Sequence, residues 1–139
     1  MPGSYAQTTT TNVTVKTSTG TMGEYLADAN GMSLYMFDLD NPGKSNCLGQ
    51  CAKVWPPLTV SGSQSTFTAG GTANSSMLSP ITRDDGILQL TYNKLPLYTY
   101  AGDKAAGDTN GQGIKESGGM WYLVKPDGTK LMPTGSTAQ

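Results

Sequence analysis

The chain has 139 residues, about the length of one domain. Only 14% of the residues are charged, and Gly (18) and Pro (8) are frequent, which excludes long charged surface helices and favours strands and turns. The sequence has no His, so the Ser-His-Asp triad, the Cys-His nucleophile pair and His-ligated zinc or haem are all excluded. A net charge of −1 argues against nucleic acid as a partner.

The N-terminal region is dominated by Thr and Ser, so we expect residues 1–20 to form a flexible arm. Val13 and Val15 alternate with polar residues, which makes an edge strand possible over residues 12–17. Residues 134–139 are expected to form a flexible tail. No apolar stretch reaches the roughly 20 residues that a membrane helix needs, so no membrane span is expected.

Three strand–turn–strand patterns follow along the chain. Their turns are Asn30-Gly31 between residues 25–29 and 32–37, Asp84-Asp85-Gly86 between 79–83 and 87–92, and Pro126-Asp127-Gly128 between 121–124 and 129–132. No long window has a helical apolar period, so helix is limited to short turns near residues 47–54. The polar residues 61–77 are expected to form a long surface connection.

The two cysteines are separated by three residues. Cys47 and Cys51 can form a local disulfide or remain free thiols; a zinc site would need two further ligands that the sequence does not supply. We favour a structural disulfide, which implies an oxidising compartment and a secreted or cell-surface location. Asn12 and Asn74 fit the N-glycosylation pattern, although such matches arise easily by chance in a chain rich in Ser and Thr.

The sequence contains an internal repeat at an offset of 63 residues. The shift places Asn30, Leu34, Tyr35, Phe37 and Asp40 on Asn93, Leu97, Tyr98, Tyr100 and Asp103. A Trp follows each copy, Trp55 in the first and Trp121 in the second. We therefore predict one domain over residues 21–133, made of two repeats at about 21–60 and 79–132 that are related by an approximate twofold axis.

The repeated motif has a structural interpretation. The Tyr and the aromatic residue two positions later share one face of a strand, and the Asp lies beyond the strand end, where a carboxylate can accept backbone N–H bonds. Large rings carry most of the burial in a small core, so the two Trp residues are the expected partners of these aromatic faces.

Several blocks together resemble a known family. Besides the two motif copies, these are Cys47-x3-Cys51-Ala52, Trp55-Pro56-Pro57-Leu58, Asn93-Lys94-x-Pro96-Leu97-Tyr98, the Gly-rich loop 107–113 and Trp121-Tyr122-x-Val124-x-Pro126-Asp127-Gly128. Over residues 22–131 the chain is similar to the bacterial and archaeal lipoproteins and secreted proteins called secreted repeats of unknown function. The resemblance implies a β-rich, secreted or envelope-associated module with no established activity. The family's acylatable N-terminal Cys has no counterpart before Cys47.

Some of these residues also allow functional interpretations. Asp40 and Asp103 could hold a hard cation such as Ca²⁺, or serve as an acid and base pair, but turn capping is favoured. The six repeat rings could form an open platform for sugars, but core packing is favoured at strand spacing. The loop 107–113 lacks the Gly-Lys-Ser/Thr ending of a phosphate loop, so we expect a shaped turn.

The sequence thus predicts an all-β protein in which two related antiparallel hairpin repeats form one small sandwich or barrel-like domain. We expect a non-catalytic, secreted or cell-surface structural or interaction module that needs no cofactor. One alternative is a subunit of an extracellular fibre or surface layer that assembles with copies of itself, or with other cell-surface components, through its N-terminal arm. The other is an envelope protein that binds a cation or a small ligand.

Overall fold

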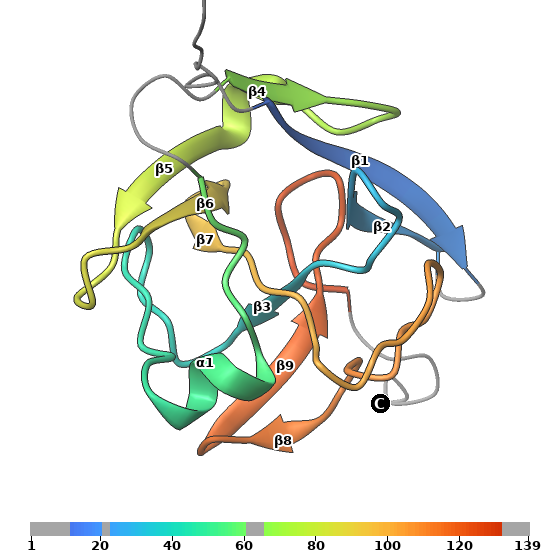
Figure 1. Ribbon diagram of the computed structural model, residues 1–139. Helices are drawn as coiled ribbons and strands as arrows, with labels where there is room; N and C mark the ends of the chain where they lie inside the picture. Colours follow the sequence, from blue (N-terminus) through green and yellow to red (C-terminus); the bar gives the residue numbers. More distant parts are fainter. Residues whose placement is uncertain (1–11, 21–22, 61–65, 132–139) are drawn as a thin grey trace, which may run out of the picture.

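A computed structural model of the chain describes residues 12–20, 23–60 and 66–131. Within these ranges the protein is built from three small β-sheets with one short α-helix, and the strands do not close into a barrel (Figure 1). The predicted all-β class is confirmed. The expected flexible segments 1–11 and 134–139 lie outside the described residues.

The first sheet has the order β2-β1-β4. Strand β1 (Asn12–Gly20) pairs antiparallel with β2 (Gly23–Asp28) and parallel with β4 (Thr66–Ala69). The predictions of an edge strand at 12–17 and of a flexible arm as far as residue 20 are therefore wrong. The alternation of Val13 and Val15 buries both side chains against the core, and a strand buried on one face can be central as easily as peripheral.

The second sheet has the order β5-β6-β7 and contains the predicted hairpin. Its strands are β5 (Leu78–Thr82), β6 (Leu88–Tyr92) and β7 (Leu95–Pro96), and the turn between β5 and β6 has Gly86 at a φ of 85°. The segment 57–60 extends this sheet: the Leu58 N–H donates to the Leu97 carbonyl, and the Leu58 carbonyl accepts from the Leu90 N–H.

The third sheet joins a strand of the first repeat to two strands of the second, in the order β3-β9-β8. Strand β3 (Tyr35–Phe37) pairs with β9 (Gly119–Leu123), which also pairs with β8 (Lys115–Glu116). The turn at Asn30-Gly31 is present, with bonds from Asp28 N–H to Met32 O and from Leu34 N–H to Leu26 O. The expected long hairpin over 25–37 is cut short, because β3 leaves β2 to pair with β9.

The remaining described segments complete the fold. The short helix expected near residues 47–54 is α1 (Gln50–Val54). The stretch 61–77 is more than a loop, since it contains β4 and the 3-10 helix η2 (Ser75–Met77). Strand β4 pairs with β1, and its two Thr residues suit a strand because they are β-branched. No helix among the described residues has the length and apolarity needed to cross a membrane.

The core divides into two clusters. The first is mainly aliphatic and includes Val15, Leu26, Leu34, Leu90 and Leu97, contributed by or beside β1, β2, β6 and β7. The second is mainly aromatic and lies around β3 and β9; its members are Tyr25, Tyr35, Phe37, Cys47, Trp55, Tyr98, Trp121, Leu123 and Leu131. All six aromatic residues of the two repeats belong to, or pack against, this aromatic cluster.

Candidate functional site

In each repeat, the motif Tyr donates a hydrogen bond to the motif Asp of the other repeat. The Tyr35 hydroxyl of the first repeat donates to Oδ2 of Asp103 in the second at 2.7 Å, and the Tyr98 hydroxyl of the second donates to Oδ2 of Asp40 in the first at 2.6 Å. The backbones of the two Tyr residues also bond reciprocally, N–H to O, at 2.7 and 3.0 Å. Contacts that recur with the copies interchanged are those of an approximate twofold axis passing between Tyr35 and Tyr98.

The second oxygen of each Asp closes a turn, as the motif predicts. Oδ1 of Asp40 accepts the Asn46 N–H at 2.6 Å, and Oδ1 of Asp103 accepts the Asn110 N–H at 2.8 Å. Each Asn side chain then donates to the carbonyl of the residue preceding that Asp. The capping role is thus present in both copies, with an Asn partner that sequence reasoning missed.

Four rings of the repeats form one continuous stack. Phe37 stacks on Trp121 with ring centroids 4.2 Å apart, Trp121 on Trp55 at 3.9 Å, and Trp55 on Tyr100 at 4.2 Å. Both Trp rings are fully buried, and Tyr100 is partly exposed. The core interpretation therefore describes these rings better than an open sugar platform.

The two motif Tyr rings flank this stack edge-on. Tyr35 meets Trp55 at a centroid distance of 5.5 Å, and Tyr98 meets Trp121 at 5.0 Å. Gly111, in the Gly-rich loop, lies so close to the stack that an added Cβ would be 2.8 Å from the Trp55 ring. The shaped loop 107–113 therefore covers the rings.

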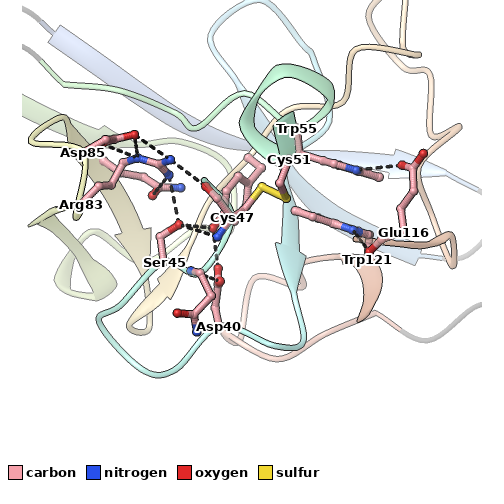
Figure 2. The surroundings of a disulfide bond; sticks show 12 residues. Asp40, Ser45, Cys47, Cys51, Trp55, Arg83, Asp85, Glu116 and Trp121 are labelled. Carbon is pink, nitrogen blue, oxygen red and sulfur yellow. Dashed lines mark hydrogen bonds and ion pairs between the residues drawn. A yellow bond between two sulfur atoms is a disulfide. The ribbon is translucent and has the colours of Figure 1, made fainter. Parts of the chain in front are cut away.

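Glu116 accepts hydrogen bonds from the indole N–H groups of both Trp residues. Trp55 Nε1 donates to the Glu116 carboxylate at 3.0 Å, and Trp121 Nε1 donates to the Glu116 carbonyl at 3.2 Å. The disulfide between Cys47 and Cys51 lies beside this pair of indoles, as Figure 2 shows. The expected local disulfide is thus present in the structure.

A buried polar network lies on the other side of the disulfide. Arg83 is 3% exposed; its guanidinium donates to Ser45 Oγ, the Gln89 side chain and the Cys47 carbonyl, and pairs with Asp85 (Figure 2). All three guanidinium nitrogens thus have acceptors, which a buried charge requires. The sequence showed this Arg only as the residue before a turn.

Burial changes the acidity of the Tyr–Asp pairs. Burial raises the pKa of Asp40 to about 6, because desolvation outweighs the bonds from Tyr98 and Asn46 and the Arg83 charge. The pKa of Asp103 is also raised, and burial is the main cause. The pKa values of the Tyr35 and Tyr98 hydroxyls are raised by burial, and the neighbouring carboxylates raise them further. The phenols are therefore neutral, and the hydrogen bond that each donates to its Asp opposes the effect of burial on the pKa of that carboxyl group.

The geometry does not form a cation site at Asp40 and Asp103. Both carboxylates face O–H and N–H donors, and a cation requires oxygens with free lone pairs. Two other nearby carboxylates are also engaged: Asp38 accepts the Met120 N–H, and Asp108 accepts two backbone N–H groups. Among the described residues no group of three His, Cys, Asp or Glu is placed to hold a metal.

The two glycosylation candidates differ in position. Asn74 is exposed, but its side-chain oxygen accepts from the N–H and hydroxyl of Ser76 and caps η2. Asn12 begins β1, and its side chain lies outside the described part of the chain. Modification of either residue stays a prediction.

Comparison with known proteins agrees with the repeat. A family model described as a secreted repeat of unknown function matches residues 16–59 and again residues 79–125. The chain belongs to this family. No curated protein and no solved structure matched. As a member of the secreted repeat family the protein is secreted, and its disulfide is of the kind that persists in oxidising surroundings.

Proposed function

We propose that this secreted repeat protein is a non-catalytic structural and interaction module of the cell surface. The observation that supports the proposal is the pair of reciprocal Tyr–Asp hydrogen bonds. These bonds use the ionisable residues of the motif to hold one repeat to the other. Such a module presents a rigid, disulfide-closed surface to other extracellular components.

The other reactive side chains are engaged in the same way. Both cysteines form the disulfide, and the Glu116 carboxylate binds Trp55. Glu24, the other glutamate, accepts from the Thr72 hydroxyl at 3.0 Å. General acid–base or nucleophilic catalysis needs a group that is free to meet a substrate. This distribution favours a structural role over an enzymatic one.

A melting experiment distinguishes this proposal from a cation-binding function. A ligand that binds only the folded state raises the melting temperature, and the rise grows with the logarithm of the ligand concentration above its dissociation constant. We expect the same melting temperature in millimolar CaCl₂, in millimolar MgCl₂ and in EDTA, because the oxygens of Asp40 and Asp103 already face donors. A rise with Ca²⁺ that Asp40→Asn removes would overturn the structural proposal in favour of cation binding.

Self-assembly is a second candidate, and it is favoured by a specific surface feature. An open cleft of about 190 Å³ is lined by Val13, Thr14, Asp28, Ala29, Asn30, Leu58 and Thr59. The segment that contains Thr59 has its neighbours bonded to the second sheet: the backbone N–H groups of Leu58 and Val60 and the Leu58 carbonyl point toward β6 and the residues that follow β7. Successive residues of a strand alternate in the direction of these groups, so the N–H and C=O of exposed Thr59 point to the opposite edge, which borders the cleft.

We propose that this edge receives the Thr-rich segment 1–11 of a second copy as an added strand. The cleft adjoins the start of β1, so each copy has an acceptor edge next to the point where its own segment 1–11 joins the fold. Thr-rich sequence suits an added strand, because β-branched residues favour extended backbone.

Sedimentation velocity over a range of concentrations tests the assembly. We expect self-association of the full chain and its loss on deletion of residues 1–11. Thr59→Pro, which removes the donor N–H, should have the same effect. Thr59→Val keeps the backbone donor and should associate normally. A full chain that stays monomeric at high concentration would eliminate self-assembly and leave other surface components as the partners.

A further inference from the structure

Two of the buried Tyr residues donate their hydroxyl proton to the carboxyl group of an Asp, which is a base that can accept that proton. The hydroxyls of Tyr35 and Tyr98 each donate to a carboxylate, at 2.7 and 2.6 Å. Each phenolic oxygen also has a second partner, the Gly111 N–H at 3.1 Å for Tyr35 and the Ser45 hydroxyl at 2.6 Å for Tyr98. Because Tyr98 uses its proton on Asp40, Ser45 is the donor in the second bond.

This arrangement suits loss of one electron from the ring. A phenol that has lost an electron is a strong acid, so its oxidation is easy only where a base can take the proton at hydrogen-bond distance. For Tyr98 the electron leaves the ring, the phenolic O–H bond breaks, and the proton forms a new O–H bond on Oδ2 of Asp40. The products are a neutral tyrosyl radical and a neutral carboxylic acid.

The same step is available to Tyr35 with Asp103. Both radicals would keep a hydrogen bond from the new carboxylic acid and from the second partner. Both Tyr side chains have 0% relative exposure, which shields a radical from coupling with other molecules. The carboxylates therefore lie where a reversible, rather than destructive, oxidation needs them.

The ring stack connects these pairs to the surface. Tyr98 contacts Trp121, Trp121 stacks on Trp55 with an interplanar angle of 2°, and Trp55 contacts both Tyr35 and the partly exposed Tyr100. Consecutive ring centroids along this path are 3.9–5.5 Å apart. An electron can therefore pass from either buried Tyr to Tyr100 through aromatic rings in direct contact.

We propose that the two Tyr–Asp pairs and the ring stack form a redox relay that supplies electrons to a one-electron oxidant at the protein surface. The oxidant is a high-valent metal complex or an inorganic radical anion that takes one electron at the Tyr100 end and is reduced by it. The hole moves through Trp55 and Trp121 and is filled by a Tyr, whose proton passes to its Asp. Each relay holds two such electrons, one for each pair.

A photochemical oxidant tests the proposal on the intact protein. Tris-bipyridine ruthenium(II), excited by a flash in the presence of persulfate, yields ruthenium(III), a one-electron oxidant that works from outside. Transient absorption and electron paramagnetic resonance then distinguish tyrosyl from tryptophanyl radicals. We expect a long-lived neutral tyrosyl radical whose formation is slowed in D₂O, because a proton moves with the electron.

Variants identify the residues that carry the signal. Tyr35→Phe and Tyr98→Phe should each remove about half of the long-lived tyrosyl signal. The Asp40→Asn/Asp103→Asn double variant keeps an acceptor oxygen for each phenol but removes both bases, so a tryptophanyl radical should persist in place of the tyrosyl radical. Tyr92→Phe is the matched control, because the buried Tyr92 donates to the Pro126 carbonyl, which cannot take a proton.

Two outcomes would overturn the relay. One is a long-lived signal of undiminished size in the Tyr35→Phe/Tyr98→Phe double variant. The other is a wild-type protein that shows no D₂O effect and no tyrosyl radical beyond the one removed by Tyr100→Phe. The D₂O measurement needs no substitution, so the proposal stays testable even where a variant fails to fold; folding of each variant is checked by circular dichroism.

Discussion

The substitution Tyr98→Phe removes a single oxygen atom and measures what the hydrogen bonds of the Tyr98 hydroxyl between the repeats contribute to stability. The Phe ring keeps the edge-on contact with Trp121 and the burial of the side chain. The variant loses the bond to the Asp40 carboxylate and the bond from Ser45. A hydrogen bond to a charged group contributes about 1.5–3 kcal/mol and a neutral one about 0.5–1.5 kcal/mol, so we expect a loss of about 2–4 kcal/mol.

This loss is a large share of the stability of a small domain, which is about 5–15 kcal/mol. It should lower the melting temperature by about 10 °C, given a shift of roughly 3–5 °C per kcal/mol at this chain length. Urea unfolding followed by Trp fluorescence gives the free energy directly. Tyr92→Phe is the control, because the Tyr92 hydroxyl also makes two bonds, both partly buried and both with neutral backbone groups.

We expect Tyr98→Phe to cost more than Tyr92→Phe at pH 7, where Asp40 is charged, and the difference to shrink at pH 4, where Asp40 is protonated. Equal losses at both pH values would refute a charge-assisted bond between the repeats. A loss below that of the control at pH 7 would show that the bonds between the repeats stabilise the fold less than the backbone bonds of Tyr92 do.

Four further measurements follow from the same structure. Trp121→Ala should lower the free energy of unfolding by about 3–5 kcal/mol in urea titrations, because the ring is fully buried between two others; an unchanged midpoint would contradict its place in the core. Replacing Cys47 and Cys51 by Ser should cost only about 2 kcal/mol, since the disulfide closes a five-residue loop, and calorimetry should still show one cooperative transition. The pKa of Asp40 is raised to about 6 in the fold, where Tyr98 and Arg83 face it, so the folded state binds the proton more tightly than the unfolded state does. The stability of the wild type relative to Asp40→Asn should therefore fall as pH rises from about 4 to about 6, and a rise over this window would contradict the shift. Gly111→Ala should lower the melting temperature, because the new Cβ would meet the Trp55 ring at 2.8 Å; a melting temperature equal to wild type would show that the loop yields without cost.

Local patterns predicted much of the secondary structure. Asp84-Asp85-Gly86 forms its turn as expected, because Gly86 adopts the positive φ that such turns require. The hairpin at Asn30-Gly31 shows the limit of this reasoning: the turn formed, but Tyr35 bonds to Tyr98 and β3 pairs with β9 instead of continuing along β2. The choice of a distant partner depends on packing of the rings, which no short window contains.

The site was predicted in its residues but not in its pairing. Matching the two copies identified Tyr35, Asp40, Tyr98 and Asp103 and predicted the backbone caps of the two Asp residues, but it gave no partner for the Tyr hydroxyls. In the structure each Asp caps a turn in its own copy, while each Tyr hydroxyl donates to the Asp of the other copy. Arg83 was missed altogether, because no local signal shows that a charged residue before a turn will be buried with a full set of acceptors.

The crossing of the two Tyr residues explains why the protein has two copies. An Asp five residues after its Tyr lies beyond the strand end, so the hydroxyl of that Tyr meets the Asp of the other repeat where the chains cross antiparallel at Tyr35 and Tyr98. A single copy would bury a phenol and leave a carboxylate without these partners, at a cost of about 1–3 kcal/mol for each unsatisfied group. Two repeats are therefore the smallest unit in which every motif residue is satisfied, which agrees with a family model that matches this chain twice.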